Sequence, residues 1–410
     1  MTDNEKGASP RQGAIDLYSP DSYVAEMPAA ETDRLRSECP VYRHPHPDGG
    51  DYWLLTRHAD VVAVSRDHKT YSAERGFVMV DDLPPEILEQ VRSQLLGMDP
   101  PRHGPIRRLV ISRFTKSMLA EREPRIREIC REIFAAAPDQ CDFVNDLAGL
   151  LPTAVIGEMM GVPPEMWEQL RIWSDRQTAG DDPDLGASPD DIQQASVEMG
   201  TYGYQLACER LGQGGDDLTS LLVNVEIDGE KVSELEFASL FVQITVAGNE
   251  TTRGLIAGGM QQLLEQPELY RELEQNPAAI PAAVEEMLRF CCPLHYFRRT
   301  ATCPASIDGQ EVSEGDRVVM MYSAANRDPA VFEDPHQFDI HRAENPHLAF
   351  GYGIHLCLGA NLARLEARVF FEEFFRTFSG VEITGPVQRI RSNMVNGPKK
   401  MPVRLQRREG

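Results

Sequence analysis

The segment 350–359, Phe-Gly-Tyr-Gly-Ile-His-Leu-Cys-Leu-Gly, constrains the fold of this chain more than any other. A helix is expected directly after it, because 360–375 is rich in Ala, Leu, Arg and Glu with apolar residues at helical spacing. Cys357 would then lie just before a helix N-terminus, where free backbone N–H groups and the helix dipole favour a thiolate. The glycines let the backbone approach a large flat group. Together these features favour a cysteine ligand to haem iron, with a buried structural cysteine as the alternative.

A long apolar helix is expected between Ser233 and Pro267. Ser233 and Glu236 form a capping box, in which each side chain satisfies a backbone N–H of the other residue. Pro267 stops the pattern, so the helix spans roughly 30 residues, or ~45 Å at ~1.5 Å per residue. Since 240–246 is apolar nearly all round, we expect this helix to be buried.

Polar residues interrupt this helix at 247–252, Ala-Gly-Asn-Glu-Thr-Thr. A buried acid and a buried hydroxyl cost free energy unless they serve a purpose. Thr251 can donate to the carbonyl four residues back, which would open the helix near Gly248 and make room for a small ligand or water. The alternative is a kink with a satisfied buried pair, and the presence of Cys357 favours the functional interpretation.

The remaining pattern predicts a mostly helical fold with small β-sheets, in one domain over 1–410 whose first residues, 1–20, form a flexible segment. No repeat, low-complexity segment or long linker divides the chain. The expected strands and hairpins lie at 51–56, 61–64, 225–232 (turn at Asp228-Gly229), 307–312 (turn at Asp308-Gly309) and 318–321.

The net charge of −23 and the pI near 4.9 argue against binding a nucleic-acid backbone. The eight cysteines show no framework spacing, which is typical of reduced thiols in the cytosol. The start of the chain lacks an apolar core like that of a signal peptide, and the longest apolar-rich run, 237–248, is shorter than the ~20 residues of a membrane span. We therefore expect a cytoplasmic protein without a membrane anchor.

The chain resembles the cytochrome P-450 family of haem-thiolate monooxygenases from about residue 50 to its end. The family signature F-x-x-G-x-x-x-C-x-G is met by Phe350, Gly353, Cys357 and Gly359. The stretch 247–251 matches the family's A-G-x-[DE]-T. Glu286 and Arg289 match its E-x-x-R pair, for which Arg342 is the expected third member. The resemblance implies a mainly α fold that holds haem b between the long helix and the cysteine loop.

The resemblance also implies roles for individual residues. Cys357 would be the axial ligand of the iron, and Thr251 and Glu250 would bind dioxygen and deliver protons to it. His103 and Arg107 match an H-x-x-x-R pair that binds the haem propionates, and Arg299, in preference to Arg298, would be a second propionate arginine. The further haem contacts expected are His355, Phe350, Gly351, Ala247 and Gly248.

The family lines its substrate pocket from fixed places in the chain, and here those places are mostly apolar. They predict a hydrophobic substrate such as a terpenoid, a steroid or a related lipid. For many of them, a position in the plain core is the alternative. The expected pocket residues are Phe77, Val78, Met79, Val80, Trp173, Leu240, Ile244, Leu294, His295, Tyr296, Met394 and Val395.

Electrons are expected from another protein, because the chain has no flavin or nicotinamide fingerprint. The partner implied is an iron–sulfur ferredoxin with its NAD(P)H-dependent reductase, serving a monomeric enzyme. Between Arg102 and Arg131 there are nine basic and three acidic residues. With Arg364 and Arg368 they would form a docking face, and a solvated helix face is the alternative.

The expected reaction inserts one atom of O2 into an unactivated C–H bond of the hydrophobic substrate. A peroxide-driven haem enzyme and a haem sensor or carrier without turnover are the alternatives, and both are disfavoured by the Glu250–Thr251 pair. A zinc site built from Cys291, Cys292, His295 and Cys303 is disfavoured, because their spacing fits no common ligand pattern.

Overall fold

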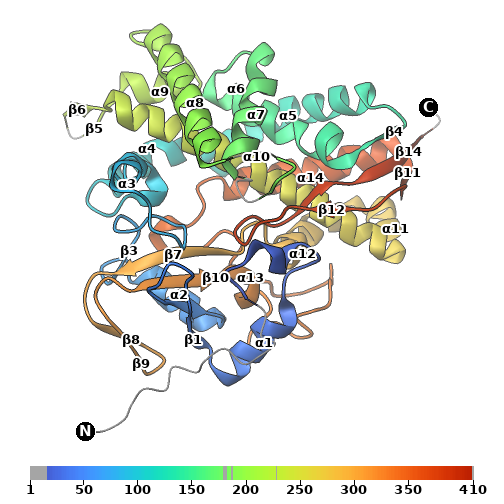
Figure 1. Ribbon diagram of the computed structural model, residues 1–410. Helices are drawn as coiled ribbons and strands as arrows, with labels where there is room; N and C mark the ends of the chain where they lie inside the picture. Colours follow the sequence, from blue (N-terminus) through green and yellow to red (C-terminus); the bar gives the residue numbers. More distant parts are fainter. Residues whose placement is uncertain (1–15, 179–181, 186–187, 228, 409–410) are drawn as a thin grey trace, which may run out of the picture.

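The computed structural model describes residues 16–178, 182–185, 188–227 and 229–408. In the view of Figure 1, helices α5–α9 lie above the central helix α10, and the largest sheet lies below it. The α-helices are α1 (Ala29–Glu38), α2 (His58–Arg66), α3 (Pro85–Val91), α4 (His103–Ile111), α5 (Lys116–Ala136), α6 (Leu150–Met160), α7 (Trp167–Thr178), α8 (Pro189–Arg210), α9 (Leu218–Asn224), α10 (Glu234–Glu265), α11 (Pro267–Gln275), α12 (Ile280–Cys291), α13 (Tyr322–Ala325) and α14 (Ala360–Thr377). The short helical turns are η1 (Pro20–Tyr23), η2 (Leu95–Gly97), η3 (Ser112–Phe114), the π-helical η4 (Phe143–Ala148), η5 (Pro164–Met166), η6 (Pro277–Ala279) and η7 (Gly353–His355).

The strands form one large sheet and several small ones. The five-stranded sheet has the order β1-β2-β10-β7-β3, in which β10 runs parallel to β2 and antiparallel to β7. A three-stranded sheet has the order β11-β14-β4, and β5-β6, β8-β9 and β12-β13 are two-stranded. The strands are β1 (Val41–His44), β2 (Tyr52–Leu55), β3 (Tyr71–Ser72), β4 (Gln140–Asp142), β5 (Glu226–Ile227), β6 (Glu230–Lys231), β7 (Tyr296–Ala301), β8 (Ala305–Ile307), β9 (Gln310–Val312), β10 (Arg317–Met321), β11 (Phe378–Ile383), β12 (Gln388–Arg389), β13 (Pro398–Lys400) and β14 (Pro402–Arg407).

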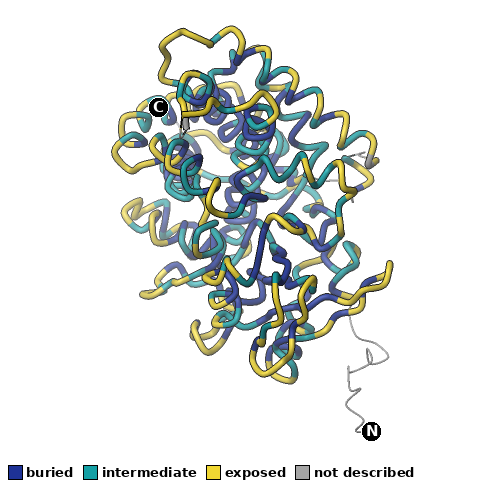
Figure 2. The backbone as a smooth tube through the Cα atoms, turned by 90° about the vertical axis from the view of Figure 1, so that its left-hand side faces the viewer, coloured by how far each residue is buried: buried dark blue, intermediate teal, exposed yellow. Residues whose placement is uncertain are grey.

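Helix α10 is the centre of the helical core, as predicted. Its 32 residues begin at the Ser233–Glu236 capping box and end before Pro267. It packs against α6, α7, α8, α12 and α14, so it carries buried residues on all of its sides. Buried backbone accordingly fills the middle of the molecule in Figure 2. Among the described residues, no helix combines the length and apolar character that a bilayer span requires.

The predicted hairpin at 307–312 is confirmed as β8 and β9. Asp308 and Gly309 at its turn both have positive φ, 48° and 79°, which is the backbone that a tight two-residue hairpin turn needs. The strands expected at 51–56 and 318–321 are β2 and β10. The hairpin expected at 225–232 is β5 and β6, although Asp228 of its turn lies outside the described residues.

Two expectations differ from the structure. The strand predicted at 61–64 is part of helix α2, because four apolar residues fit either period, and Val61 and Val64 are buried while Ala63 is exposed. The flexible segment expected over 1–20 does not reach that far, since Leu17 is buried and Ser19 caps η1. Residues 1–15 lie outside the described part of the chain.

A fully buried ion pair ties α12 to the irregular chain before the cysteine segment. Arg289 donates to both carboxylate oxygens of Glu286 at 2.8 and 2.6 Å, and both side chains are 0% exposed. Arg342 adds a further ion pair to Glu286 at 3.3 Å, as expected. Arg289 also donates to the carbonyl oxygens of Asn326, Pro335 and Gln337. The pair therefore fixes the path of the chain from 326 to 342.

We predict that Glu286→Gln lowers the free energy of unfolding by about 3–5 kcal/mol, because it leaves buried arginine charges uncompensated. Glu314→Gln is the matched control and is expected to cost less than about 1 kcal/mol, since Glu314 and Arg75 form an exposed pair. Urea unfolding of the two variants, followed by circular dichroism, measures the difference. Equal losses would contradict a structural role for the buried pair.

Candidate active site

One large cavity lies between α10 and the segment that contains Cys357. About 1300 Å³ of space between atoms lies within it, a volume that includes space open to solvent. The wall formed by α10 consists of Gln243, Ile244, Ala247, Gly248, Thr251, Thr252 and Leu255. The wall formed by the cysteine segment and α14 consists of Ala349, Phe350, Gly351, His355, Leu356, Cys357, Leu358, Gly359, Leu362, Ala363 and Glu366. The two segments that the sequence singled out thus line the same cavity.

The backbone before Cys357 requires its glycines. Gly351 and Gly353 have φ of 68° and 74°, a conformation that side chains disfavour. A Cβ at Gly353 would also collide with the carbonyl oxygen of Ser65, so glycine lets this loop lie directly on α2. The Cys357 N–H then donates to the Phe350 carbonyl at 2.8 Å, which closes the loop.

The Cys357 side chain faces the cavity and is otherwise enclosed by protein. Burial raises the pKa of its thiol, and the backbone N–H of Gly359 and the charges of Arg107 and Arg364 only partly oppose this. The backbone N–H at the helix start thus lowers the pKa of the thiol as expected, but desolvation outweighs this effect. A cation bound in the cavity would reverse the balance, since a metal favours the thiolate.

Basic side chains that form no ion pair with any described acidic residue lie on and beside the cavity wall: His103, Arg107 and His355 line the cavity, and Arg299 lies near them. The rings of His103 and His355 are 4.6 Å apart, and each has a buried Nε2 with no hydrogen-bond partner among the described residues. Burial, and then nearby positive charges, lower the pKa of His103 to about 4 and that of His355 to about 2. Arg107 and Arg299 lie close enough to contribute to these shifts. Unpartnered donors and buried cations are suited to a ligand that carries carboxylates.

The two neighbouring arginines on β7 have different surroundings. Arg298 pairs with Asp82 at 2.7 Å and donates to the carbonyl oxygens of Val80 and Asp81, so it holds the segment 80–82. Arg299 is 4% exposed, has no ion pair among the described residues, and donates only to the Arg298 carbonyl at 2.8 Å. Of the two, Arg299 is therefore the one left available to a ligand.

Thr251 lies on the α10 wall of the cavity. Its hydroxyl donates to the Ala247 carbonyl oxygen at 2.8 Å, as the sequence suggested. The expected opening of the helix near Gly248 is absent, since α10 is continuous there. A Cβ at Gly248 would instead meet the side chain of Ile156 from α6, so this glycine serves close helix packing.

Glu250 does not line the cavity, so in this conformation its carboxylate lies apart from the wall that Thr251 occupies. Its carboxylate pairs with Arg253, and Arg253 also pairs with Asp175 of α7 at 2.8 Å. Burial raises the pKa of Glu250, and the Arg253 charge opposes the rise. Glu250 Oε2 has no partner among the described residues.

Only two of the expected pocket residues, Ile244 and Leu294, line the cavity. Trp173 packs on Tyr202 and donates to Glu198 of α8, while the His295 ring bonds to Ser323. The other expected pocket residues also lie outside the cavity lining: Phe77, Val78, Met79, Val80, Leu240, Tyr296, Met394 and Val395. The positions at which the family lines its pocket did not show which of these side chains face the cavity and which pack in the core.

Several lining residues were not anticipated. Gln243 and Leu255 lie eight residues before and four after Thr251, so the helical period of α10 could have identified them. Leu95 and Leu96, from η2, carried no such signal. Glu366 of α14 is a buried acid whose Oε2 lacks a partner among the described residues, and burial raises its pKa well above the ordinary range.

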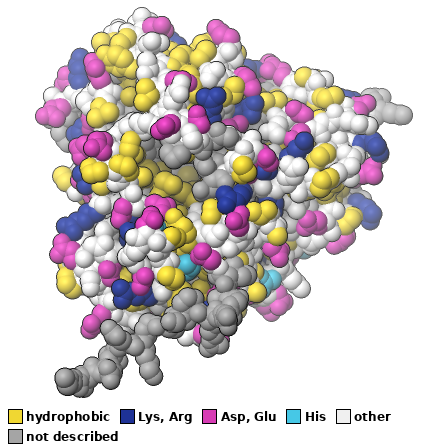
Figure 3. Space-filling model, viewed as in Figure 1, with side chains coloured by type: hydrophobic (Ala, Val, Ile, Leu, Met, Phe, Trp, Pro, Cys, Tyr) yellow, Lys and Arg dark blue, Asp and Glu magenta, His cyan; other side chains and the backbone are white. Residues whose placement is uncertain are grey.

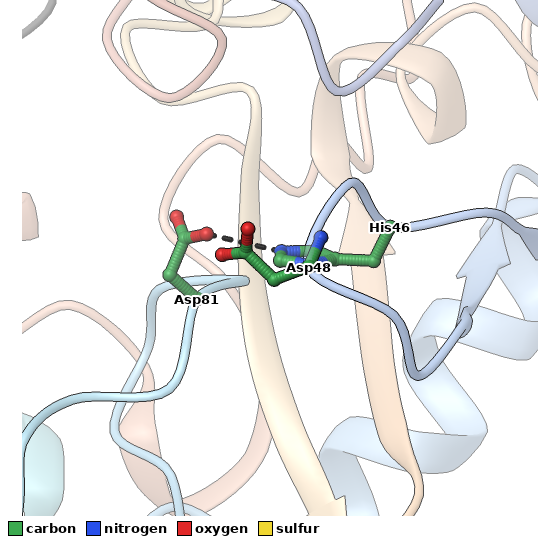
Figure 4. Close-up of side chains that lie close together, drawn as sticks. All are labelled: His46, Asp48 and Asp81. Carbon is green, nitrogen blue, oxygen red and sulfur yellow. Dashed lines mark hydrogen bonds and ion pairs between the residues drawn. The ribbon is translucent and has the colours of Figure 1, made fainter.

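The zinc alternative is wrong. Cys291, Cys292, His295 and Cys303 do not converge, and the group of potential metal ligands found within the described ranges is His46, Asp48 and Asp81 (Figure 4). In that group the His46 ring bonds to Asp81 at 3.0 Å, and the Tyr18 hydroxyl donates to the same carboxylate at 2.8 Å. These hydrogen bonds explain the cluster as a structural link between the N-terminal segment and the loop at residue 81.

Comparison with known proteins agrees with this geometry. The family model "Cytochrome P450" matches residues 209–403. A methyl-branched lipid omega-hydroxylase of Mycobacterium tuberculosis is 37% identical over 404 residues, which cover 95% of this chain and 93% of the relative. A steroid C26-monooxygenase of Rhodococcus jostii is also 37% identical, over 95% of this chain and 84% of the relative. The structure of a Mycobacterium marinum cytochrome P450 in complex with pseudoionone superposes with a TM-score of 0.90 at 33% identity, covering 97% of this chain and 99% of the other.

A cysteine that opens onto the cavity, a polar stretch of a central helix and two histidines whose Nε2 atoms have no partner among the described residues line one largely apolar cavity. The relatives that share nearly the whole chain are a lipid omega-hydroxylase and a steroid C26-monooxygenase. The chain belongs to the cytochrome P450 family, and it is a monooxygenase whose cofactor is protoporphyrin IX haem.

Proposed function

We propose that this enzyme hydroxylates an unactivated C–H bond of a lipid, steroid or terpenoid, with electrons from a ferredoxin. The observation that carries the proposal is that Cys357 and Thr251 line one cavity whose remaining α10 wall is mostly apolar. An apolar wall favours a hydrophobic substrate, because burial of its surface drives binding. The related omega-hydroxylase and C26-monooxygenase act on a lipid and on steroids, which supports the same substrate class here.

The residues that would hold the haem follow from the contacts of the cavity. Cys357 is proposed as the ligand of the iron. His103, Arg107, Arg299 and His355 are proposed to bind the propionates. The support is that both histidine Nε2 atoms are unpartnered, and that neither arginine has an ion pair among the described residues. Phe350, Gly351, Ala247 and Gly248 are proposed to pack on the ring, since they line the walls beside Cys357 and Thr251. Haem bound there supplies the iron that activates dioxygen.

Thr251 is proposed to position the proton that dioxygen cleavage needs. Its Oγ1 donates to the Ala247 carbonyl, so its lone pairs remain to accept a hydrogen bond from water in the cavity. Glu250 is proposed as the source of the proton, because burial raises its pKa and Oε2 is unpartnered among the described residues. This role requires the carboxyl to turn away from Arg253. A peroxide-driven enzyme or a haem sensor would have no use for this pair.

The ferredoxin is proposed to dock on a smaller surface than the basic count suggested. Arg102, Arg125, Arg127 and Arg131 are ion-paired to glutamates, and so are Arg364 and Arg368. Arg108 and Lys116 are exposed and have no ion pair among the described residues. Together with exposed Ile111 they form what we call the docking patch. The face in Figure 3 intersperses both signs of charge, so a local excess is needed to attract an acidic partner.

The proposal places the enzyme in the cytoplasm, as a monomer. Its eight cysteines are all free, and the cytoplasm keeps thiols reduced.

The first test is the absorption spectrum of the dithionite-reduced, carbon-monoxide-bound protein. We expect a strongly red-shifted Soret band in the wild type and its loss in Cys357→Ala, because the thiolate ligand causes the shift. Cys303→Ala, at an exposed cysteine, is the matched control and should keep the band. A red-shifted band that survives in Cys357→Ala would refute the assignment of the ligand.

For Thr251→Ala we expect product formed per electron to fall by at least about tenfold and hydrogen peroxide to appear instead, because general acid assistance is worth about 10²–10⁴-fold. Thr245→Val, on the same helix, is the control, since the Thr245 hydroxyl is buried without a partner in the described structure. Product and peroxide are quantified with ferredoxin, reductase and NADPH. Unchanged coupling in Thr251→Ala would exclude the proposed proton role.

Reversing the charges of the docking patch, as in Arg108→Glu with Lys116→Glu, is expected to slow reduction by ferredoxin about tenfold or more at low salt. The difference should shrink at ~1 M salt, where charges are screened within about 3 Å. Lys231→Glu, on exposed strand β6, is the control. Stopped-flow reduction under carbon monoxide measures the rate, and equal rates for the double variant and the control would place the docking surface elsewhere.

A further inference from the structure

Gln243 is a polar side chain in the largely apolar wall that α10 presents to the cavity. It lies on the same face of the helix as Ala247 and Thr251, which follow it at a spacing of four residues each. Its neighbours along the wall are Ile244 and Ala247, and Leu95 and Leu96 line the same cavity. A polar group in such surroundings costs free energy when a ligand displaces its water, unless the ligand offers it a partner.

The orientation of the Gln243 amide is set by the backbone. Its Oε1 accepts the N–H of Leu95, at the start of η2, at 2.7 Å. This hydrogen bond uses the carbonyl oxygen of the side chain, so the two N–H donors of Nε2 take no part in it. In the described part of the chain, Nε2 has no hydrogen-bond partner, and the side chain is only half-buried. The donors are therefore available to a molecule in the cavity.

We infer that Gln243 is a specificity-determining residue that binds an uncharged oxygen acceptor, a carbonyl or a hydroxyl, of an elongated apolar substrate. The inference rests on the proposed function, in which the oxidised carbon lies near Thr251. Eight residues separate Gln243 from Thr251, which is about 12 Å along the helix axis. An extended chain advances about 1.2 Å per bond, so the acceptor and the oxidised carbon would be about ten bonds apart.

The position of oxidation would then be set by its distance from the polar end of the substrate. A molecule whose acceptor bonds to Gln243 places the carbon about ten bonds away at the site of oxidation, whatever chain lies beyond it. A hydrocarbon of the same length leaves the amide without a partner, and a site built around a hydrogen bond discriminates against such an analogue.

The test compares n-dodecane, dodecan-2-one and tetradecan-2-one in the haem-loaded enzyme. Isothermal titration gives the Kd of each probe, and product analysis gives the hydroxylated carbon. In the wild type we expect dodecan-2-one to bind about tenfold more tightly than n-dodecane. The hydroxyl should lie about ten bonds from the carbonyl in both ketones, so that it is nearer to the chain end in the shorter one.

Gln243→Leu is expected to bring the ratio of the two Kd values close to one and to make the hydroxyl position follow the methyl end of each ketone. Gln243→Glu keeps an acceptor for Leu95 and removes the donors, so it should also lose the preference for the ketone if the donors are responsible. Gln261→Leu, on the same helix and outside the cavity lining, is the matched control and should keep the wild-type ratio. Using the ratio within each variant cancels a general change of the cavity.

The inference is overturned if the wild type does not bind dodecan-2-one, if both variants keep the wild-type ratio, or if the wild-type hydroxyl position follows the chain end. Failure of the proposed function looks different, because no probe would then yield product with ferredoxin and NADPH although titration still reports the binding preference.

Discussion

The buried Glu286–Arg289 pair is the contact on which the position of the active site depends. Arg289 holds the carbonyl oxygen of Asn326, and the Asn326 side chain in turn accepts the N–H of Leu348 at 2.6 Å. A few residues after Leu348, the chain enters the turns at Gly351 and Gly353 that precede Cys357. A charge pair on α12 thus fixes a thiol on the far side of an irregular segment that has no strand or helix of its own until η7. Because both side chains of the pair are 0% exposed, solvent cannot take the place of either partner, and the geometry cannot relax without a large free-energy cost.

Helix α10 separates its polar groups by face. Gln243 and Thr251 lie along the cavity, while Glu250 and Arg253 pair with each other in the core and Arg253 also pairs with Asp175 of α7. On the proposed function, one continuous helix would contribute to substrate orientation and to proton handling as well as to core electrostatics, without a break in its backbone. Gly248 lets α6 pack closely against the same turn of α10, because it has no Cβ to collide with Ile156.

The sequence was sufficient to predict the fold class, the long helix with its capping box, the hairpin at 307–312 and the Glu286–Arg289–Arg342 network. These features depend on local patterns or on a motif whose residues are specific. The short run at 61–64 was misassigned because four apolar residues carry no period, and burial by neighbouring elements decides their conformation. The pocket residues were mostly missed, since facing a cavity is a property of packing. The orientation of Glu250 depended on Arg253 and Asp175, and no pattern in the sequence pairs those three.

Two consecutive arginines of helix α4 face opposite sides, one toward the cavity and the other toward solvent. Arg107 reaches the cavity, where its guanidinium also donates to the Leu356 carbonyl beside Cys357, while Arg108 faces solvent within the docking patch. Only the thickness of one helix, about 10 Å, separates these two sides. On the proposed function, an electron that arrives at the surface of α4 has a short through-protein path to the cofactor edge. Turnover would then be governed by how often and how accurately the donor docks, so small changes in surface charge would alter the flux while leaving the chemistry of the cavity untouched.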